Sequence, residues 1–183
     1  ASYPNQAFYG GKLIPVGLSH QLEEISSPVL FIPSRRDTGS LSGKTNVYEA
    51  QMVADWAERI WKESPEAFDA HRTLGIITPY RSQIALIRKQ LQRKGISALL
   101  DISVDTVERY QGSERDVIIY SFCVNHRYQL KFLPNLTEEN GTLIDRKLNV
   151  ALTRARKRLI VIGVPELLKE NPIYHHFISS YSV

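Results

Sequence analysis

The sequence predicts one α/β domain built around a mainly parallel β-sheet. Short apolar, β-rich segments alternate with amphipathic helical patterns along the 183 residues, and this alternation is typical of parallel strands joined by helical crossovers. Several of the apolar segments are hydrophobic at successive positions, as expected for strands covered on both faces. The predicted strands are residues 29–32, 74–78, 99–104, 117–124 and 159–164.

Amphipathic helices are predicted between most of these strands. Asn46 is expected to cap the first of them, with Glu49 three residues later in a variant of the capping box. The predicted helices are residues 46–63, a segment around 84–91 that is closed by Gly95, residues 145–157, and a last helix after Pro172 with Tyr174, Phe177, Ile178 and Tyr181 on one side. A chain of this length supports one well-buried core, so a single domain over residues 1–183 is expected.

Composition excludes several functional classes. No stretch reaches the ~18 apolar residues of a membrane span, and the first residues lack a targeting signal, so a membrane association is not expected. Cys123 is the only cysteine, which excludes a disulfide framework and a multi-cysteine metal site and fits a reducing, intracellular location such as the cytoplasm. The net charge of +4 and the pI near 9.2 are compatible with a polyanionic partner but do not establish one.

One segment imitates a phosphate-binding loop. Gly43, Lys44 and Thr45 match the end of that motif, in which backbone amides wrap the phosphates and the lysine reaches the outer ones. The first glycine of the motif would fall on Thr38, and residues 33–39 separate the segment from the preceding predicted strand. No later strand ends in the Asp-Glu pair that would hold magnesium. We therefore interpret the segment as the cap of the next helix.

Chemistry is expected just after the strands, because ligands of open parallel sheets bind at the carboxyl ends. The segments there are residues 79–83, 106–116 and the long polar loop 125–145, which is expected to be mobile. In the first of them, Thr78, Pro79 and Tyr80 close a strand and open a helix. By themselves these three residues are also compatible with an ordinary strand-to-helix turn.

The segment 106–116 is more specific. It places the Thr106 hydroxyl, the Gln111 amide, the flexible Gly112 and acids that include Glu114 between two core strands. This is more hydrogen-bonding capacity than a connection needs. The alternative is a charged loop whose acids pair with nearby arginines.

A further segment, residues 145–156, contains an arginine in apolar surroundings. Arg154 follows Thr153 in an otherwise apolar stretch, where a fixed guanidinium is costly unless an anion awaits it. For Lys157 and Arg158 a simpler explanation is available, because cations at the C-terminus of a helix are stabilised by its dipole. Arg156 is expected to point to another face than Arg154.

Together these segments resemble the superfamily 1 helicases of the up-frameshift and senataxin type, over nearly the whole chain. The Thr78 turn is similar to motif IV of that family, residues 106–116 to motif V, and residues 148–156 to motif VI. Glu108 and Tyr110 stand where motif V usually has Asp and Phe. The resemblance implies a RecA-like, P-loop NTPase-type three-layer sandwich with a mainly parallel sheet, lacking its own phosphate-binding loop.

The same resemblance implies a role for each motif residue. Arg154 would be the catalytic arginine finger that reaches across a cleft to the γ-phosphate, a role worth ~10³–10⁵ in turnover. The implied nucleotide-binding residues are Gln111, Gly112, Glu114 and Arg154, and the implied nucleic-acid-binding residues are Thr78, Pro79, Tyr80 and Thr106.

The resemblance also implies that the chain is the C-terminal half of a longer motor. Residues 4–13 resemble the segment directly after a further family motif, which would precede Ala1. ATP with Mg²⁺ would be bound mainly by a first RecA-like domain of the same chain, single-stranded DNA or RNA would be the other partner, and translocation would run 5′ to 3′. The isolated fragment is then expected to be inactive. The alternatives are a catalytically inactive binding or docking module of the same fold, and a self-contained phosphate-loop enzyme.

Overall fold

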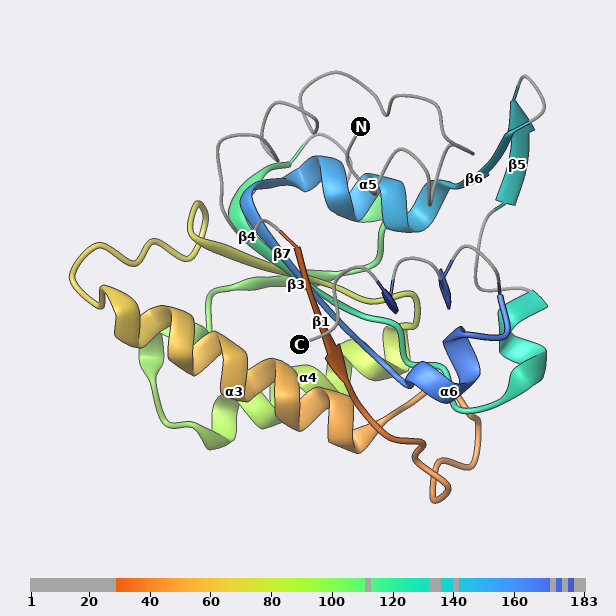
Figure 1. Cartoon of the computed structure of the whole chain (residues 1–183). Coiled ribbons are helices and arrows are strands. Elements are labelled where there is room, and N and C mark those ends of the chain that lie inside the picture. Colours follow the sequence, from red (N-terminus) through yellow and green to blue (C-terminus); the bar gives the residue numbers. More distant parts are fainter. Residues whose placement is uncertain are drawn as a thin grey trace.

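The computed structural model describes residues 29–110, 113–131, 136–139, 142–171, 174–175 and 178–179. Its centre is a five-stranded sheet in the order β1-β7-β4-β2-β3, in which every neighbouring pair is parallel (Figure 1). The strands are β1 (Val29–Pro33), β2 (Leu74–Ile77), β3 (Ser103–Asp105), β4 (Arg115–Ser121) and β7 (Ala155–Gly163). The predicted parallel α/β sheet is confirmed.

Helices on both faces of the sheet complete three layers (Figure 1). The helices α3 (Val47–Glu63) and α4 (Arg81–Arg93) lie against one face, α5 (Arg146–Arg154) lies against the other, and the short α6 (Pro165–Leu168) follows β7. This is the RecA-like three-layer arrangement that the sequence predicts. Among the described residues, none of the helices combines the length and the apolar character needed to cross a membrane.

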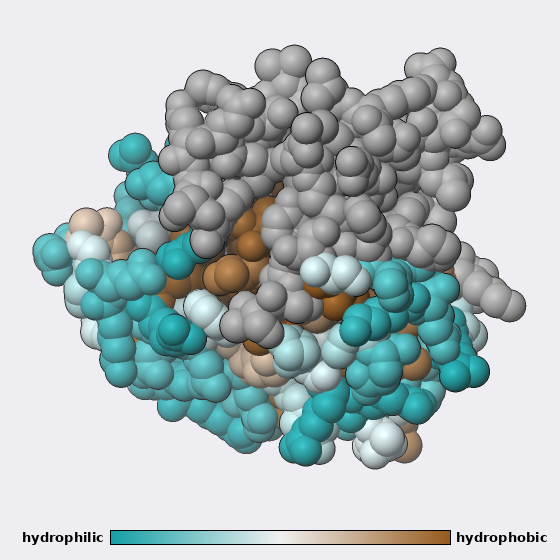
Figure 2. All heavy atoms as spheres, in the orientation of Figure 1, coloured by the Kyte–Doolittle hydropathy of each residue, from teal (hydrophilic) through white to brown (hydrophobic). Residues whose placement is uncertain are grey.

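The strands send successive side chains into two separate cores. Ile76 and Ile119 belong to the core under α3 and α4, whereas Ile77 and Ile118 belong to the core under α5. Both faces of each strand are therefore buried, which explains why the strands are apolar at successive positions. The outer surface of the α3 layer is largely hydrophilic in the view of Figure 2, as its amphipathic pattern predicts.

The helix predicted over residues 145–157 is shorter than expected at both ends. Asp145 belongs to the strand β6, and α5 ends at Arg154 because Ala155 already pairs with Arg115 in the sheet. Arg156 therefore lies on a strand, and its orientation cannot be argued from helical spacing. The strand predicted over residues 99–104 is also shorter, because a 3₁₀ turn at Ser97–Leu99 precedes β3.

The loop predicted over residues 125–145 contains regular structure. A 3₁₀ turn covers Arg127–Lys131, and β5 (Leu136–Glu139) pairs antiparallel with β6 (Thr142–Asp145). Between these strands the sequence has Asn140-Gly141, a dipeptide that favours tight hairpins. No regular structure was assigned to this loop from the sequence, although the hairpin signal was present there. The expected mobility stays a prediction.

Gly75 is required by the packing of Tyr110 across β2. A Cβ at Gly75 would overlap the Tyr110 hydroxyl and come within 2.8 Å of Tyr110 Cζ. We predict that Gly75→Ala lowers the free energy of unfolding by about 1–3 kcal/mol, because the ring must move. Gly39→Ala is the matched control, since a Cβ there meets only Asp37 Oδ1 at 3.4 Å. Urea unfolding followed by circular dichroism compares the two variants, and equal stability would contradict the prediction.

Candidate functional site

The motif residues lie at both edges of the sheet. Because all five strands are parallel, the segments after the strands share one edge, called here the carboxyl edge, and those before the strands share the amino edge. Thr106 and the turn at Pro79-Tyr80 follow β3 and β2 at the carboxyl edge. Glu114 and Arg154 directly precede β4 and β7 at the amino edge. Glu114 and Arg154 therefore precede strands, whereas the sequence favoured candidate residues directly after the strands.

Strand register brings Glu114 and Arg154 together. Arg115 of β4 is paired with Ala155 of β7, so the residues that precede them, Glu114 and Arg154, adjoin the same strand pair at the amino edge. Glu114 is exposed and Arg154 is half-buried. Glu114 and Arg154 are therefore close in the fold although they are far apart in the sequence.

Arg154, at the amino edge, keeps no carboxylate partner among the described residues. Its Nε and Nη2 atoms lie 3.4 and 3.3 Å from Thr153 Oγ1, and the Thr153 hydroxyl donates to the Val150 carbonyl at 2.8 Å. No described carboxylate lies within ion-pairing distance of its guanidinium. This arrangement leaves a positive group available for an anion.

The basic residues that follow Arg154 are all paired with acids. Arg156 Nε lies 3.2 Å from Asp116 Oδ1, Lys157 Nζ lies 3.9 Å from Asp116 Oδ2, and Arg158 Nη2 lies 3.2 Å from Glu63 Oε2. From the sequence, Lys157 and Arg158 were explained by the dipole at the C-terminus of a helix. Both residues lie on the strand β7, so that explanation does not apply.

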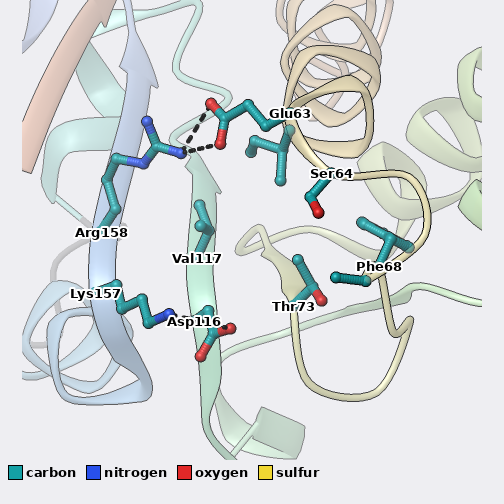
Figure 3. A pocket seen from close by; sticks show the side chains of 10 residues that line it. Glu63, Ser64, Phe68, Thr73, Asp116, Val117, Lys157 and Arg158 are labelled. Carbon is teal, nitrogen blue, oxygen red and sulfur yellow. Dashed lines mark hydrogen bonds and ion pairs between the residues drawn. The ribbon is translucent and has the colours of Figure 1, made fainter.

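A pocket of about 480 Å³ lies beside these ion pairs, on the α3 side of the amino edge. Figure 3 shows Arg158 directed at Glu63, and Lys157 directed at Asp116. The apolar wall of the pocket includes Phe68 and Val117. Because the charges around it are matched within the chain, the pocket offers no surplus charge to a phosphate.

Arg115 anchors the backbone beside Glu114. Its buried guanidinium donates from Nη1 to Ser113 Oγ at 2.7 Å and to the Glu114 carbonyl at 2.8 Å, and from Nη2 to Ser103 Oγ at 3.2 Å. These bonds tie the end of the motif V segment to β3. The sequence offered Arg115 only as a partner for acids of the loop, and it forms no ion pair with a carboxylate of the described residues.

The two departures from the family pattern are accommodated. Tyr110 is buried, and its hydroxyl donates to the Ser103 carbonyl at 3.2 Å. Glu108 Oε1 lies 3.7 Å from Lys147 Nζ, which links the motif V segment to α5. Gln111 and Gly112, the other predicted nucleotide-binding residues, lie outside the described residues.

The candidate strand-binding residues at the carboxyl edge differ in accessibility. Thr78 is fully buried, and its hydroxyl donates to the Ser121 carbonyl at 2.9 Å. The Thr78 amide donates to the Asp105 carbonyl at 3.1 Å, so neither the side chain nor the backbone of Thr78 is exposed to a bound strand in this structure. Pro79, Tyr80 and Thr106 are half-buried and reach the surface. Burial raises the pKa of the Tyr80 phenol, which keeps it a neutral hydrogen-bonding group.

Buried amides hold the loops of the carboxyl edge together. Asn125 Nδ2 donates to the Gly43 and Thr45 carbonyls at 3.0 and 2.7 Å, and Asn125 Oδ1 accepts from the Asp37 amide at 2.9 Å. Gln83 accepts from the Asn46 amide at 2.9 Å and donates to the Asn46 carbonyl at 3.0 Å. The segment before α3 is thereby fixed to the turns after β2 and β4. Sequence reasoning assigned no role to Asn125.

The segment that imitates a phosphate loop already has a carboxylate at the start of α3. Asp37 Oδ2 accepts from the Val47 amide at 3.0 Å, and Asp37 Oδ1 accepts from the Gly39 amide at 3.1 Å. A phosphate at this helix N-terminus would meet a negative charge in its place. The geometry agrees with the interpretation of this segment as a cap.

Glu49 contributes only half of the expected capping box. Asn46 Oδ1 accepts from the Glu49 amide at 2.9 Å as predicted, but the Glu49 carboxyl turns inward. It accepts from the Ser34 and Ser121 hydroxyls at 2.8 Å and from the Cys123 amide at 3.0 Å. Burial raises the pKa of Glu49 from 4.5 to about 7, although these hydrogen bonds oppose the shift. Glu49 thus links β1, α3 and β4 at the carboxyl edge.

The fold and the motif residues on it define a helicase domain of the RecA-like α/β class. A solved structure, the C-terminal domain of a possible DNA helicase from Lactobacillus plantarum WCFS1, is similar with a TM-score of 0.51. It is 14% identical, and the match covers 92% of this chain and 94% of that chain. At this identity the likeness supports the fold alone.

Sequence comparisons identify the family. A family model described as an AAA domain matches residues 1–166. The chain is 30% identical over 199 residues to the DNA polymerase alpha-associated DNA helicase A of Schizosaccharomyces pombe, covering 96% of this chain and 28% of that protein. It is 31% identical over 192 residues to regulator of nonsense transcripts 1 of Dictyostelium discoideum, covering 98% and 14%.

Helicase sen1 of Schizosaccharomyces pombe is also similar, at 32% identity over 146 residues that cover 78% of this chain and 8% of that protein. The chain therefore spans less than a third of the length of each of these relatives. It belongs to the AAA domain family and, within it, to the superfamily 1 helicases of the up-frameshift and senataxin type.

The raised pKa of Glu49 predicts a pH-dependent stability. Because the folded state holds the proton more tightly than the unfolded chain, this stabilisation is complete below about pH 4.5 and is lost as the pH rises through about 7. Glu49→Gln stays neutral, so the stability difference between wild type and variant should fall by up to about 3 kcal/mol over that window. Urea unfolding at a series of pH values measures this difference. A pH-independent difference would show that the carboxyl does not titrate there.

Proposed function

We propose that this chain is the second motor domain of an ATP-dependent helicase, and that residues 1–183 form that one domain within a longer protein. The observation that carries the proposal is the path of one segment. It leaves β3 at the carboxyl edge with Thr106, and it enters β4 at the amino edge with Glu114 beside Arg154. One connection thus joins the proposed strand-binding edge to the proposed nucleotide-binding edge.

In this proposal the amino edge meets the nucleotide. The half-buried Arg154 guanidinium, which keeps no described carboxylate partner, suits the γ-phosphate of ATP, and it would neutralise charge that develops on the transferred group. Glu114, held in place by Arg115, would face the nucleotide together with Gln111 and Gly112. Most contacts to ATP and Mg²⁺ would come from a first RecA-like domain. Among the described residues no cluster of acids, histidines or cysteines is suited to hold a metal ion.

The carboxyl edge would bind a single strand of DNA or RNA. Pro79, Tyr80 and Thr106 would contact its backbone, with Thr78 supporting the turn from inside the sheet. Contacts of this kind give salt-dependent affinity with little sequence preference. Closure of the two domains on ATP would shift the motif V segment, and Thr106 would move along the strand with it. Translocation from 5′ to 3′ is expected from the family.

Two other functions are separable from this one. The first is a catalytically inactive docking or binding module. Such a module has no need of Arg154, an arginine that forms no ion pair with a described carboxylate and lies near Glu114. A self-contained phosphate-loop enzyme is disfavoured by the Asp37 carboxylate at the start of α3. ATP binding by this chain alone that disappears in Lys44→Ala would revive the second alternative.

Replacing Arg154 tests the proposed finger. In the longer parent chain, single-stranded DNA or RNA should stimulate ATP turnover, and Arg154→Ala should lower that turnover by about 10³-fold or more. Binding of the strand should survive, because Arg154 is at the opposite edge of the sheet. The measurement is phosphate release with and without oligonucleotide, together with fluorescence anisotropy for binding.

Arg156→Ala is the matched control for this experiment. It removes the same type of side chain two positions further along the chain, but Arg156 is already paired with Asp116, so turnover should change little. The isolated chain should show no turnover. Turnover that is absent in the parent chain, or indifferent to Arg154, would instead support the inactive module.

A further inference from the structure

An aromatic pair at the carboxyl edge is not used by the function proposed above. His126 and Tyr128 follow β4, and their rings stack with centroids 5.4 Å apart and planes 10° from parallel. Tyr128 nevertheless keeps 54% of its surface exposed. A large aromatic ring that is partly stacked and still exposed offers a surface for another planar group.

This pair is held rigidly by the network at the same edge. Both rings lie against Gly43, where a Cβ would come within 2.9 Å of His126 Cδ2 and 3.0 Å of Tyr128 Oη. The buried Gln129 accepts from the His126 amide at 2.9 Å and donates to the Gly43 carbonyl at 2.9 Å. These hydrogen bonds fix the backbone that carries the two rings, and a site held in this way needs less ordering when a ligand stacks on it.

A hollow of about 440 Å³ lies beside the pair, between the 3₁₀ turn and α6. Figure 1 shows that turn next to α6. The hollow is lined by Arg36, His126, Arg127, Tyr128, Glu166, Leu167 and Glu170. Arg127 Nε lies 2.8 Å from Glu170 Oε1, which offsets the charge of that acid. Arg36 donates from Nε to the Asn125 carbonyl at 2.8 Å and is exposed. The hollow thus combines an aromatic wall with Arg36 at one part of its lining and the acidic Glu166 at another.

The hollow adjoins the proposed path of the strand. Gln129 Nε2, which supports the aromatic pair, also donates to the Tyr80 hydroxyl at 3.1 Å. The exposed Lys44 has its Nζ 5.9 Å from the centre of the Tyr80 ring, and its carbonyl accepts from the Ser82 hydroxyl at 2.8 Å. A strand that lies on the Tyr80 turn therefore passes Lys44. It then reaches His126 and Tyr128, because Gln129 connects these rings to Tyr80 through hydrogen bonds.

We propose that this hollow receives one base of the bound single strand, stacked on Tyr128, while Lys44 and Arg36 meet the phosphates on either side. The proposal rests on the proposed function, because it assumes that a strand crosses the Tyr80 turn. Stacking on an aromatic ring accepts any base and so suits a motor that moves along a strand. The site would add base stacking to a surface whose other contacts are made with the backbone.

The test uses the longer parent chain and a fluorescein-labelled oligothymidylate, with affinity measured by anisotropy. Tyr128→Ala should weaken binding on the order of tenfold, and Tyr128→Phe should retain it, because stacking needs the ring and not the hydroxyl. The slope of affinity against salt should stay the same, since no charge is removed. Leu100→Ala, another exposed large hydrophobic residue, is the matched control and should bind as wild type does.

An oligonucleotide that lacks its bases separates stacking from a structural effect. Wild type should bind this abasic strand more weakly than it binds oligothymidylate. Tyr128→Ala should bind the abasic strand with the same affinity as wild type does, because there is no base left to stack. If Tyr128→Ala binds oligothymidylate as tightly as wild type while Thr106→Ala binds it weakly, the stacking site is wrong and the proposed function stands. If neither substitution weakens binding, the strand does not cross this edge, and both proposals are wrong.

Discussion

The pairing of β4 with β7 is the constraint on which both candidate sites depend. These are the central strands of the sheet, and their register places Arg115 opposite Ala155. From this one alignment it follows that Glu114 and Arg154 are neighbours. The helix α5 ends at Arg154, directly before β7, and its Lys147 reaches Glu108 of the motif V segment. A shift of one residue would separate these groups and turn every side chain of the strand to the opposite face.

Two different kinds of polar structure support the two edges. At the amino edge, the basic residues of β7 form ion pairs at the surface. Such pairs contribute little to stability in water. At the carboxyl edge buried amides and the Glu49 carboxyl are almost fully hydrogen-bonded. Buried groups of this kind are costly to disturb, because any one that loses its partner stays desolvated. The carboxyl edge is thus built as a rigid surface, and the amino edge offers accessible charge.

The buried network also explains the difference between residues that share one motif. Thr78 and Tyr80 are two positions apart, yet the hydroxyl of Thr78 is enclosed at the sheet while Tyr80 reaches the surface and contacts Gln129. Similarity to a motif therefore identifies a segment that matters without saying which atoms face a ligand. Arg115 lies within motif V, but it has a structural role there, because its guanidinium donates to the backbone carbonyl of Glu114.

The sequence by itself determined the elements of this protein and the identity of its motifs. Hydrophobic periodicity located all five strands of the parallel sheet and the first two described helices, α3 and α4, because that signal is local. Only the tertiary structure decided where α5 gives way to β7, which basic residues are paired, and that Glu49 turns inward instead of completing its cap. Each of these depends on a partner far away in the chain, and a partner at long sequence separation leaves no periodic trace in the residues around it.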